Sequence, residues 1–165
     1  MSDDSIRVQP IGVIRSPHRD PAATPIQPVF ATDIAGTVEV DRAYAAGLQD
    51  LEGFSHIYLL YHFDRAPATK LVVRPYLQDE DHGVFATRAP GRPNALGLSI
   101  VRLERRAGCI LHVLDIDVLD GTPLLDIKPY VPRFDIRRAA HSGWQARVDE
   151  ETAARRGRRD VAPSG

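Results

Sequence analysis

The sequence contains a single cysteine and no long apolar run, and both shortages exclude classes of protein. Cys109 alone cannot form an intramolecular disulfide, and a cysteine-built zinc site needs more thiolates than the chain has. No stretch approaches the roughly 20 apolar residues of a membrane-spanning helix, and residues 1–5 lack the apolar segment of a secretory signal. We therefore expect a cytoplasmic protein that is not inserted in a membrane.

Glycine-rich nucleotide-binding motifs are also missing. A Rossmann methyltransferase would need strands alternating with helices and a Gly-x-Gly-x-x-Gly-like turn after its first strand. The chain has neither feature, and it lacks the Gly-x-x-x-x-Gly-Lys-Ser/Thr loop and the hydrolase nucleophile elbow. These absences disfavour the large α/β folds.

The sequence has instead many short apolar segments separated by turn-forming residues. Ile34, Val38 and Val40 fall on one face of an alternating segment, and the run 56–63 is apolar on both faces, which predicts the most buried strand. The expected strands are 34–40, 56–63, 70–74, 99–105, 110–118 and 124–130, with a tight turn over residues 119–123 between the last two. Residues 79–82 are expected to form a polar turn whose charges are a solvated face. This pattern predicts a mainly β fold, namely a small closed or nearly closed β-barrel with short helices and a polar C-terminal tail.

The segment 110–118 carries both apolar and acidic residues. Period-two alternation predicts that Asp115 and Asp117 lie on the face opposite the apolar side chains. Those apolar side chains are Ile110, Leu114, Ile116 and Val118. We therefore expect both carboxylates to point away from the core.

The 165 residues, of which 43% are hydrophobic, suffice for one ordinary core. The formal net charge of −1 is unevenly distributed, because seven arginines and four acidic residues follow from Arg137 onward, so this tail carries +3 and the rest −4. We expect a domain over residues 1–136 and a polar, basic C-terminal segment over residues 137–165. Such a tail either assists contact with nucleic-acid phosphates or is a solvated terminal helix.

Residues 83–99 combine two prolines and three glycines with polar side chains. The prolines restrict the backbone, so the loop loses little entropy on ordering and can hold Arg88, Arg92 and Asn94 in fixed positions. Gln27 lies between two prolines in a second loop of this kind. Each loop is either part of a binding site or a rigid connection with solvated side chains.

Two histidines, His56 and His62, lie at or near the ends of the apolar run 56–63. Neither has a second histidine or a cysteine at metal-ligand spacing. We therefore expect no metal site and a partly buried, hydrogen-bonded position for both.

Five motifs follow one another along roughly residues 6–135. They are Gly12-Val13-Ile14-Arg15-Ser16-Pro17, Gly53-Phe54-Ser55-His56-Ile57, Gly83-Val84-Phe85-Ala86-Thr87-Arg88, Arg92-Pro93-Asn94-Ala95-Leu96-Gly97-Leu98-Ser99 and Asp120-Gly121-Thr122-Pro123-Leu124-Leu125-Asp126-Ile127-Lys128-Pro129-Tyr130. In this order they resemble the successive motifs of the TsaA-like, or TrmO-type, family. The resemblance implies an S-adenosylmethionine-dependent methyltransferase on a β-barrel, working as a homodimer with its cofactor near the subunit interface. The best-described activity of the family is methylation of N6 on the threonylcarbamoyladenosine beside the tRNA anticodon.

The resemblance also implies which residues bind the cofactor. By motif position these are Pro25, Ile26, Gln27, Asp64, Arg65, Arg88, Leu98, Asp120, Gly121, Thr122 and Pro123. The cofactor offers a carboxylate that suits arginine and hydroxyl groups that suit an acidic acceptor, so Arg88 and Asp120 are candidates for these contacts. Arg92 and Asn94 either hold their loop together or contact the methyl acceptor.

The chain departs from the family pattern at two places. Asp64-Arg65 stands where the longer members carry His-Gln, and Ala95-Leu96 follows Asn94 where Pro-Ile is usual. The first departure leaves the general base open among Asp64, His62 and Tyr130, and no catalytic residue is assigned. The chain also resembles a short form without the additional C-terminal domain of the longer members.

Three functions stay open. The first is a tRNA methyltransferase, the second a methyltransferase of the same fold with another substrate, and the third a non-catalytic S-adenosylmethionine-binding or regulatory protein. For a tRNA substrate, the expected phosphate contacts are Arg92, Arg102, Arg105, Arg106 and the basic tail.

Overall fold

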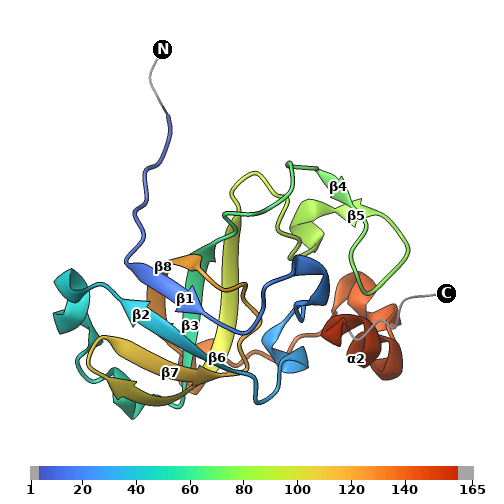
Figure 1. Cartoon of the computed structure of the whole chain (residues 1–165). Helices are drawn as coiled ribbons and strands as arrows, with labels where there is room; N and C mark the ends of the chain where they lie inside the picture. The colour runs from blue at the N-terminus through green and yellow to red at the C-terminus, as the bar shows by residue number, and fades with distance from the viewer. Residues whose placement is uncertain (1–3, 160–165) are drawn as a thin grey trace.

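Six antiparallel strands close into a barrel in a computed structural model that describes residues 4–159 (Figure 1). The strand order around the barrel is β1-β2-β7-β6-β3-β8, and β1 closes it by pairing with both β2 and β8. The barrel strands are β1 (Gly12–Arg15), β2 (Ala35–Val40), β3 (His56–His62), β6 (Leu96–Ala107), β7 (Ile110–Leu114) and β8 (Thr122–Pro129). The predicted β-barrel is confirmed.

Alternate side chains of each strand fill the barrel interior, as period-two geometry requires. Val38, Leu59, Val101 and Leu111 come from four different strands and are all fully buried. Val40 is 6% exposed on the same face as Val38, so the face predicted for β2 is confirmed.

Strand β3 lies between β6 and β8 and is apolar on both faces, but only one face is buried. Leu59 and Tyr61 point into the core, whereas Tyr58 and Leu60 are half-buried on the outer face of the barrel. Leu60 lies directly opposite Leu98 of β6, whose side chain is also on that face. The outer face of β3 is thus half-buried, and His62 is the exposed residue of the strand.

The face predicted for residues 110–118 was wrong within the strand but right for Ile116 and Val118, which are 0% and 3% exposed. Leu111 and Val113 point into the core, while Ile110 is 40% exposed. The strand ends at Leu114 because Asp115 adopts a left-handed backbone conformation with φ of 70°. Beyond this turn the alternation no longer holds, because Ile116, Asp117 and Val118 are all buried, with Asp117 9% exposed.

The remaining elements lie outside the barrel. The strand expected over residues 70–74 is reduced to β4 (Val72–Val73), which pairs with β5 (His82–Gly83) in a separate two-stranded sheet. The short 3₁₀ helices are η1 (Pro21–Ala23), η2 (Pro28–Phe30), η3 (Arg42–Leu48), η4 (Leu51–Gly53), η5 (Val84–Ala86) and η6 (Gly143–Arg147), and the α-helices are α1 (Pro132–Asp135) and α2 (Glu150–Arg158). Figure 1 shows α2 on the same side of the barrel as the β4–β5 sheet. Over residues 4–159, no helix has the length and apolarity needed to cross a bilayer.

Candidate functional site

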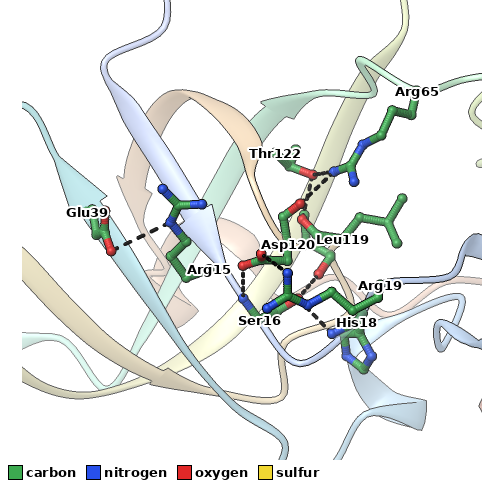
Figure 2. Close-up of polar contacts among 10 residues, drawn as sticks. Arg15, Ser16, His18, Arg19, Glu39, Arg65, Leu119, Asp120 and Thr122 are labelled. Atoms are coloured by element: carbon green, nitrogen blue, oxygen red, sulfur yellow. Dashed lines mark hydrogen bonds and ion pairs between the residues drawn. The ribbon is translucent and has the colours of Figure 1, made fainter.

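Arg65 follows the end of β3 and reaches the segment that leads into β8 (Figure 2). Its Nη2 donates to the Asp120 carbonyl oxygen at 2.8 Å and to Thr122 Oγ1 at 3.2 Å. Thr122 Oγ1 in turn donates to the Leu119 carbonyl at 2.7 Å, and the Arg65 Nε lies 3.4 Å from Asp64 Oδ1. Arg65 therefore ties the ends of two neighbouring strands together at one end of the barrel.

The turn before β8 is held by Asp120. Its Oδ1 accepts from the Ser16 backbone N–H at 3.1 Å, and its Oδ2 lies 2.9 Å from Arg19 Nη1 (Figure 2). Gly121 has φ of 81°, a conformation that favours glycine, and its N–H donates to the Ile14 carbonyl. The carboxylate thus fixes the loop after β1 against the turn, and the predicted tight turn is confirmed.

The two proline-rich loops of the sequence meet at Gln27 and Arg88. Arg88 Nη1 donates to Gln27 Oε1 at 2.7 Å although 61 positions separate them. Gln27 is half-buried directly before η2, and Arg88 is exposed two residues after η5. Pro25 is buried and Ile26 half-buried beside them, so this loop is packed rather than solvated.

A buried polar network lies inside the barrel behind this pair. Ser99 Oγ donates to Asp117 Oδ1 at 2.6 Å and lies 2.9 Å from the Tyr61 hydroxyl. Burial raises the pKa of Asp117 to about 7 and also raises the pKa of Tyr61, while the positive charge of Arg88 opposes both shifts. The network therefore faces the Arg88 side of the barrel end and holds a carboxyl group that favours its neutral form.

Sequence reasoning missed this network because it placed Asp117 on the solvent face. A signal was nonetheless present at Gly97 in β6. A Cβ built on Gly97 would lie 2.0 Å from Cε2 of Tyr61, so only glycine leaves room for this ring.

Three predicted residues lie apart from these contacts. Leu98 is 47% exposed on the outer face of β6. Arg92 Nη1 donates to the carbonyls of Thr87 and Ala89 at 3.0 and 3.3 Å, which supports the loop-holding alternative. Asn94 is exposed, and its backbone carbonyl accepts from the Leu96 N–H.

The candidates for a general base are dispersed. Asp64 and His62 lie near the end of β3 that carries Arg65, whereas the Tyr130 N–H bonds to the carbonyl of His56 at the opposite end. The ring of Tyr130 contacts His56 and Tyr58, with centroids 6.1 and 5.8 Å apart. Within one chain, Tyr130 is therefore remote from the Arg65 end.

His56 and His62 of β3 differ in their exposure to solvent. His56 is half-buried and its Nδ1 lies 2.8 Å from Ser55 Oγ, as predicted, but His62 is exposed, so the prediction for His62 was wrong. In the part of the chain that the structure describes, no three His, Cys, Asp or Glu side chains gather as a metal site would require.

Two of the arginines expected to contact phosphates are already paired with acidic residues. Arg102 binds the carboxylates of Asp33 and Asp115, and Arg106 Nη1 lies 3.0 Å from Glu52 Oε1. These pairs compete with a phosphate for the same guanidinium groups, which makes Arg102 and Arg106 weaker candidates than the sequence suggests.

The part of the chain that matches known proteins is the part that forms the barrel. Residues 13–136 match the model of the tRNA-methyltransferase O N-terminal domain. A probable S-adenosyl-L-methionine-binding protein of Pyrococcus abyssi is 58% identical over 136 residues, which cover 82% of this chain and 74% of that protein. A mouse protein named tRNA (adenine(37)-N6)-methyltransferase is 33% identical over 138 residues, which cover 79% of this chain but 32% of the mouse protein.

Solved structures agree with these matches. The crystal structure of TrmO from Pseudomonas aeruginosa superposes with a TM-score of 0.71 at 42% identity, over 85% of this chain and 62% of that one. Another crystal structure of TrmO gives a TM-score of 0.73 at 44% identity, over 84% of this chain and 64% of that one. The chain thus spans somewhat less than two thirds of both solved proteins.

Proposed function

The chain belongs to the family of the tRNA-methyltransferase O N-terminal domain, and from that membership we propose that it is an S-adenosylmethionine-dependent methyltransferase acting on tRNA. The match over residues 13–136 carries the proposal, because it includes every candidate cofactor residue. It also spans all the barrel strands, apart from the first residue of β1. The methyl acceptor we propose is N6 of threonylcarbamoyladenosine beside the anticodon. The name of the mouse relative, a tRNA adenine N6-methyltransferase, supports this choice of atom.

The side chains at the Arg88 end of the barrel suit S-adenosylmethionine chemically. Gln27 occupies only Nη1 of the Arg88 guanidinium, so other N–H groups of this exposed side chain can meet the carboxylate of the cofactor. Rigid loops around Pro25 and the turn at Asp120–Pro123 offer backbone groups for the adenine and ribose. When bound, the cofactor supplies an activated methyl group on its sulfonium.

The protein's part in the reaction is mainly to position the acceptor. Transfer of a methyl group from a sulfonium is an in-line displacement, so holding the reacting atoms in line supplies much of the acceleration. We propose Asp64 or His62 as the base that removes the N6 proton, since both lie near the Arg65 end of β3.

We also propose that the working form is a homodimer that pairs through the outer face of β3 and β6. On β6, Leu96, Leu98 and Ile100 are 53%, 47% and 37% exposed and follow one another at alternate positions. Such a contiguous apolar surface is typical of a protein–protein interface. Leu98, a candidate cofactor residue by motif position, lies within this surface.

Two measurements on the purified chain test the proposal. Calorimetry with S-adenosylmethionine should detect binding, and its absence would overturn the cofactor assignment. Mass spectrometry of nucleosides should then show N6-methylated threonylcarbamoyladenosine after incubation with modified tRNA and cofactor. Binding without any methyl transfer would favour the alternative of a non-catalytic binding protein, since the Pyrococcus abyssi relative is named only for binding. A cytoplasmic location stays a prediction.

A further inference from the structure

The C-terminal segment packs against both loops that carry the Gln27–Arg88 pair. This segment consists of η6 and α2, residues 143–159, and we call it the C-terminal clamp. Figure 1 shows α2 next to the loop that contains η2 and on the side of the barrel where β4 and β5 lie. The clamp lies outside residues 13–136, the part matched by the family model.

The first contact of the clamp is with the Gln27 loop. The Ile26 N–H donates to the carbonyl of Gly157 at 2.9 Å, so a carbonyl in the last turn of α2 is satisfied by the residue next to Gln27. Gly157 is buried against Phe30, and a Cβ built on it would lie 2.4 Å from the Phe30 ring. The close approach of helix and loop therefore depends on glycine at this position.

The second contact is with the Arg88 loop. The indole Nε1 of Trp144 donates to the Ala86 carbonyl at 2.8 Å, two residues before Arg88. The same indole stacks on His82, with centroids 4.9 Å apart and an interplanar angle of 12°. Trp144 thus contacts this loop at two points.

Two ion pairs join the clamp to the acidic turn at residues 79–82, which precedes the Arg88 loop. Arg156 makes two hydrogen bonds to the Asp79 carboxylate at 3.0 and 3.1 Å, and Arg147 lies 3.1 Å from Glu80. These side chains are largely exposed except Arg156, so each pair stabilises the protein only modestly. The ion pairs show that the clamp packs on the acidic turn at residues 79–82. The prediction that the charges of this turn form a solvated face was therefore wrong for Asp79 and Glu80.

We propose that the C-terminal clamp positions Gln27 and Arg88 for binding of S-adenosylmethionine, an inference that rests on the proposed function. The 2.7 Å bond between these side chains requires two loops from distant parts of the sequence to keep one relative position. The clamp bonds to both of these loops, to one through Gly157 and to the other through Trp144. A pre-positioned pair binds its ligand without the entropy cost of ordering, so loosening the clamp weakens cofactor affinity and leaves the methyl-transfer step nearly unchanged.

Two variants of the full chain test the clamp. Gly157→Val forces a side chain into the Phe30 ring, while Trp144→Phe removes the Nε1 donor and leaves a smaller aromatic ring that can still stack on His82. The matched control is Arg155→Ala, an exposed position on the same helix. We expect both test variants to raise the Kd for S-adenosylmethionine and its KM by about tenfold or less at nearly constant kcat, with the control unchanged.

A double-mutant cycle separates positioning from general destabilisation. In an Arg88→Ala background, Trp144→Phe should have little further effect on cofactor affinity, because the pair that it positions is gone. Fully additive losses, or wild-type affinity in both Gly157→Val and Trp144→Phe, would overturn the clamp. If the unaltered chain binds no S-adenosylmethionine, the proposed function itself is overturned. Trp144 is the only tryptophan of the chain, so its fluorescence gives a second binding signal in the unaltered protein and the control.

Discussion

The hydroxyl of Ser99 donates to the buried carboxyl group of Asp117 across 2.6 Å, inside the barrel. This contact joins a strand residue to a residue of the irregular segment between β7 and β8. Burial raises the pKa of Asp117 although the Ser99 hydrogen bond opposes that shift, and the titration of this carboxyl group therefore makes the stability of the barrel depend on pH.

The pKa of Asp117 is raised from 3.8 to about 7 on folding. The folded state therefore binds more protons than the unfolded state between these values, and this contribution to stability is lost as the pH rises from about 4 to about 7. Asp117→Asn cannot ionise and should remove the effect. We expect the Tm of the variant relative to the unaltered protein to increase from pH 5 to pH 8 by at least about 3 °C in thermal unfolding. An equal Tm difference at both pH values would contradict the assignment.

Gly97→Ala should destabilise the barrel. The added methyl group would lie 2.0 Å from the Tyr61 ring, which is itself packed in the core. Displacing the ring also strains its hydrogen bond with Ser99, so we expect a loss of about 3 kcal/mol in the free energy of unfolding by urea. Gly53→Ala is the matched control, since a Cβ there has no neighbour within 4 Å. Equal stability of the two variants would refute the steric argument.

Arg88→Ala should weaken cofactor binding and leave the fold intact. The side chain is exposed, so its removal costs little stability, but a charge-assisted contact to the cofactor is lost. We expect the Kd for S-adenosylmethionine to rise at least about tenfold in calorimetry, with an unchanged Tm. Arg42→Ala, at an exposed position in η3, should bind like the unaltered chain. Normal affinity in Arg88→Ala would remove this residue from the site.

Leu98→Glu should separate the proposed dimer into folded monomers. A charge in the centre of the apolar face of β6 opposes burial against a second copy, whereas within one chain the side chain is already 47% exposed. Sedimentation velocity should show about half the mass of the unaltered protein. Ile110→Glu, at a position 40% exposed on β7, serves as control and should remain dimeric. A monomeric unaltered chain would reject the dimer.

The sequence was most informative where structure depends on neighbouring residues. Alternation at Val38 and Val40 predicted the buried face of β2, and the turn-forming residues after Leu119 predicted the turn before β8. The same rule failed over residues 110–118, because the left-handed turn at Asp115 ends the strand, and beyond it Ile116, Asp117 and Val118 are all buried. A pattern in sequence does not reveal such a backbone change when the residue is not glycine.

By itself, the sequence determined the barrel class and the family, because strand alternation and ordered motifs are both properties of consecutive residues. The tertiary structure decided which polar groups meet. Gln27 contacts Arg88 across 61 positions, and the basic tail packs on the acidic turn at residues 79–82 instead of extending into solvent. Such pairs depend on how the loops pack around the closed barrel. Composition and spacing along the chain do not predict that packing.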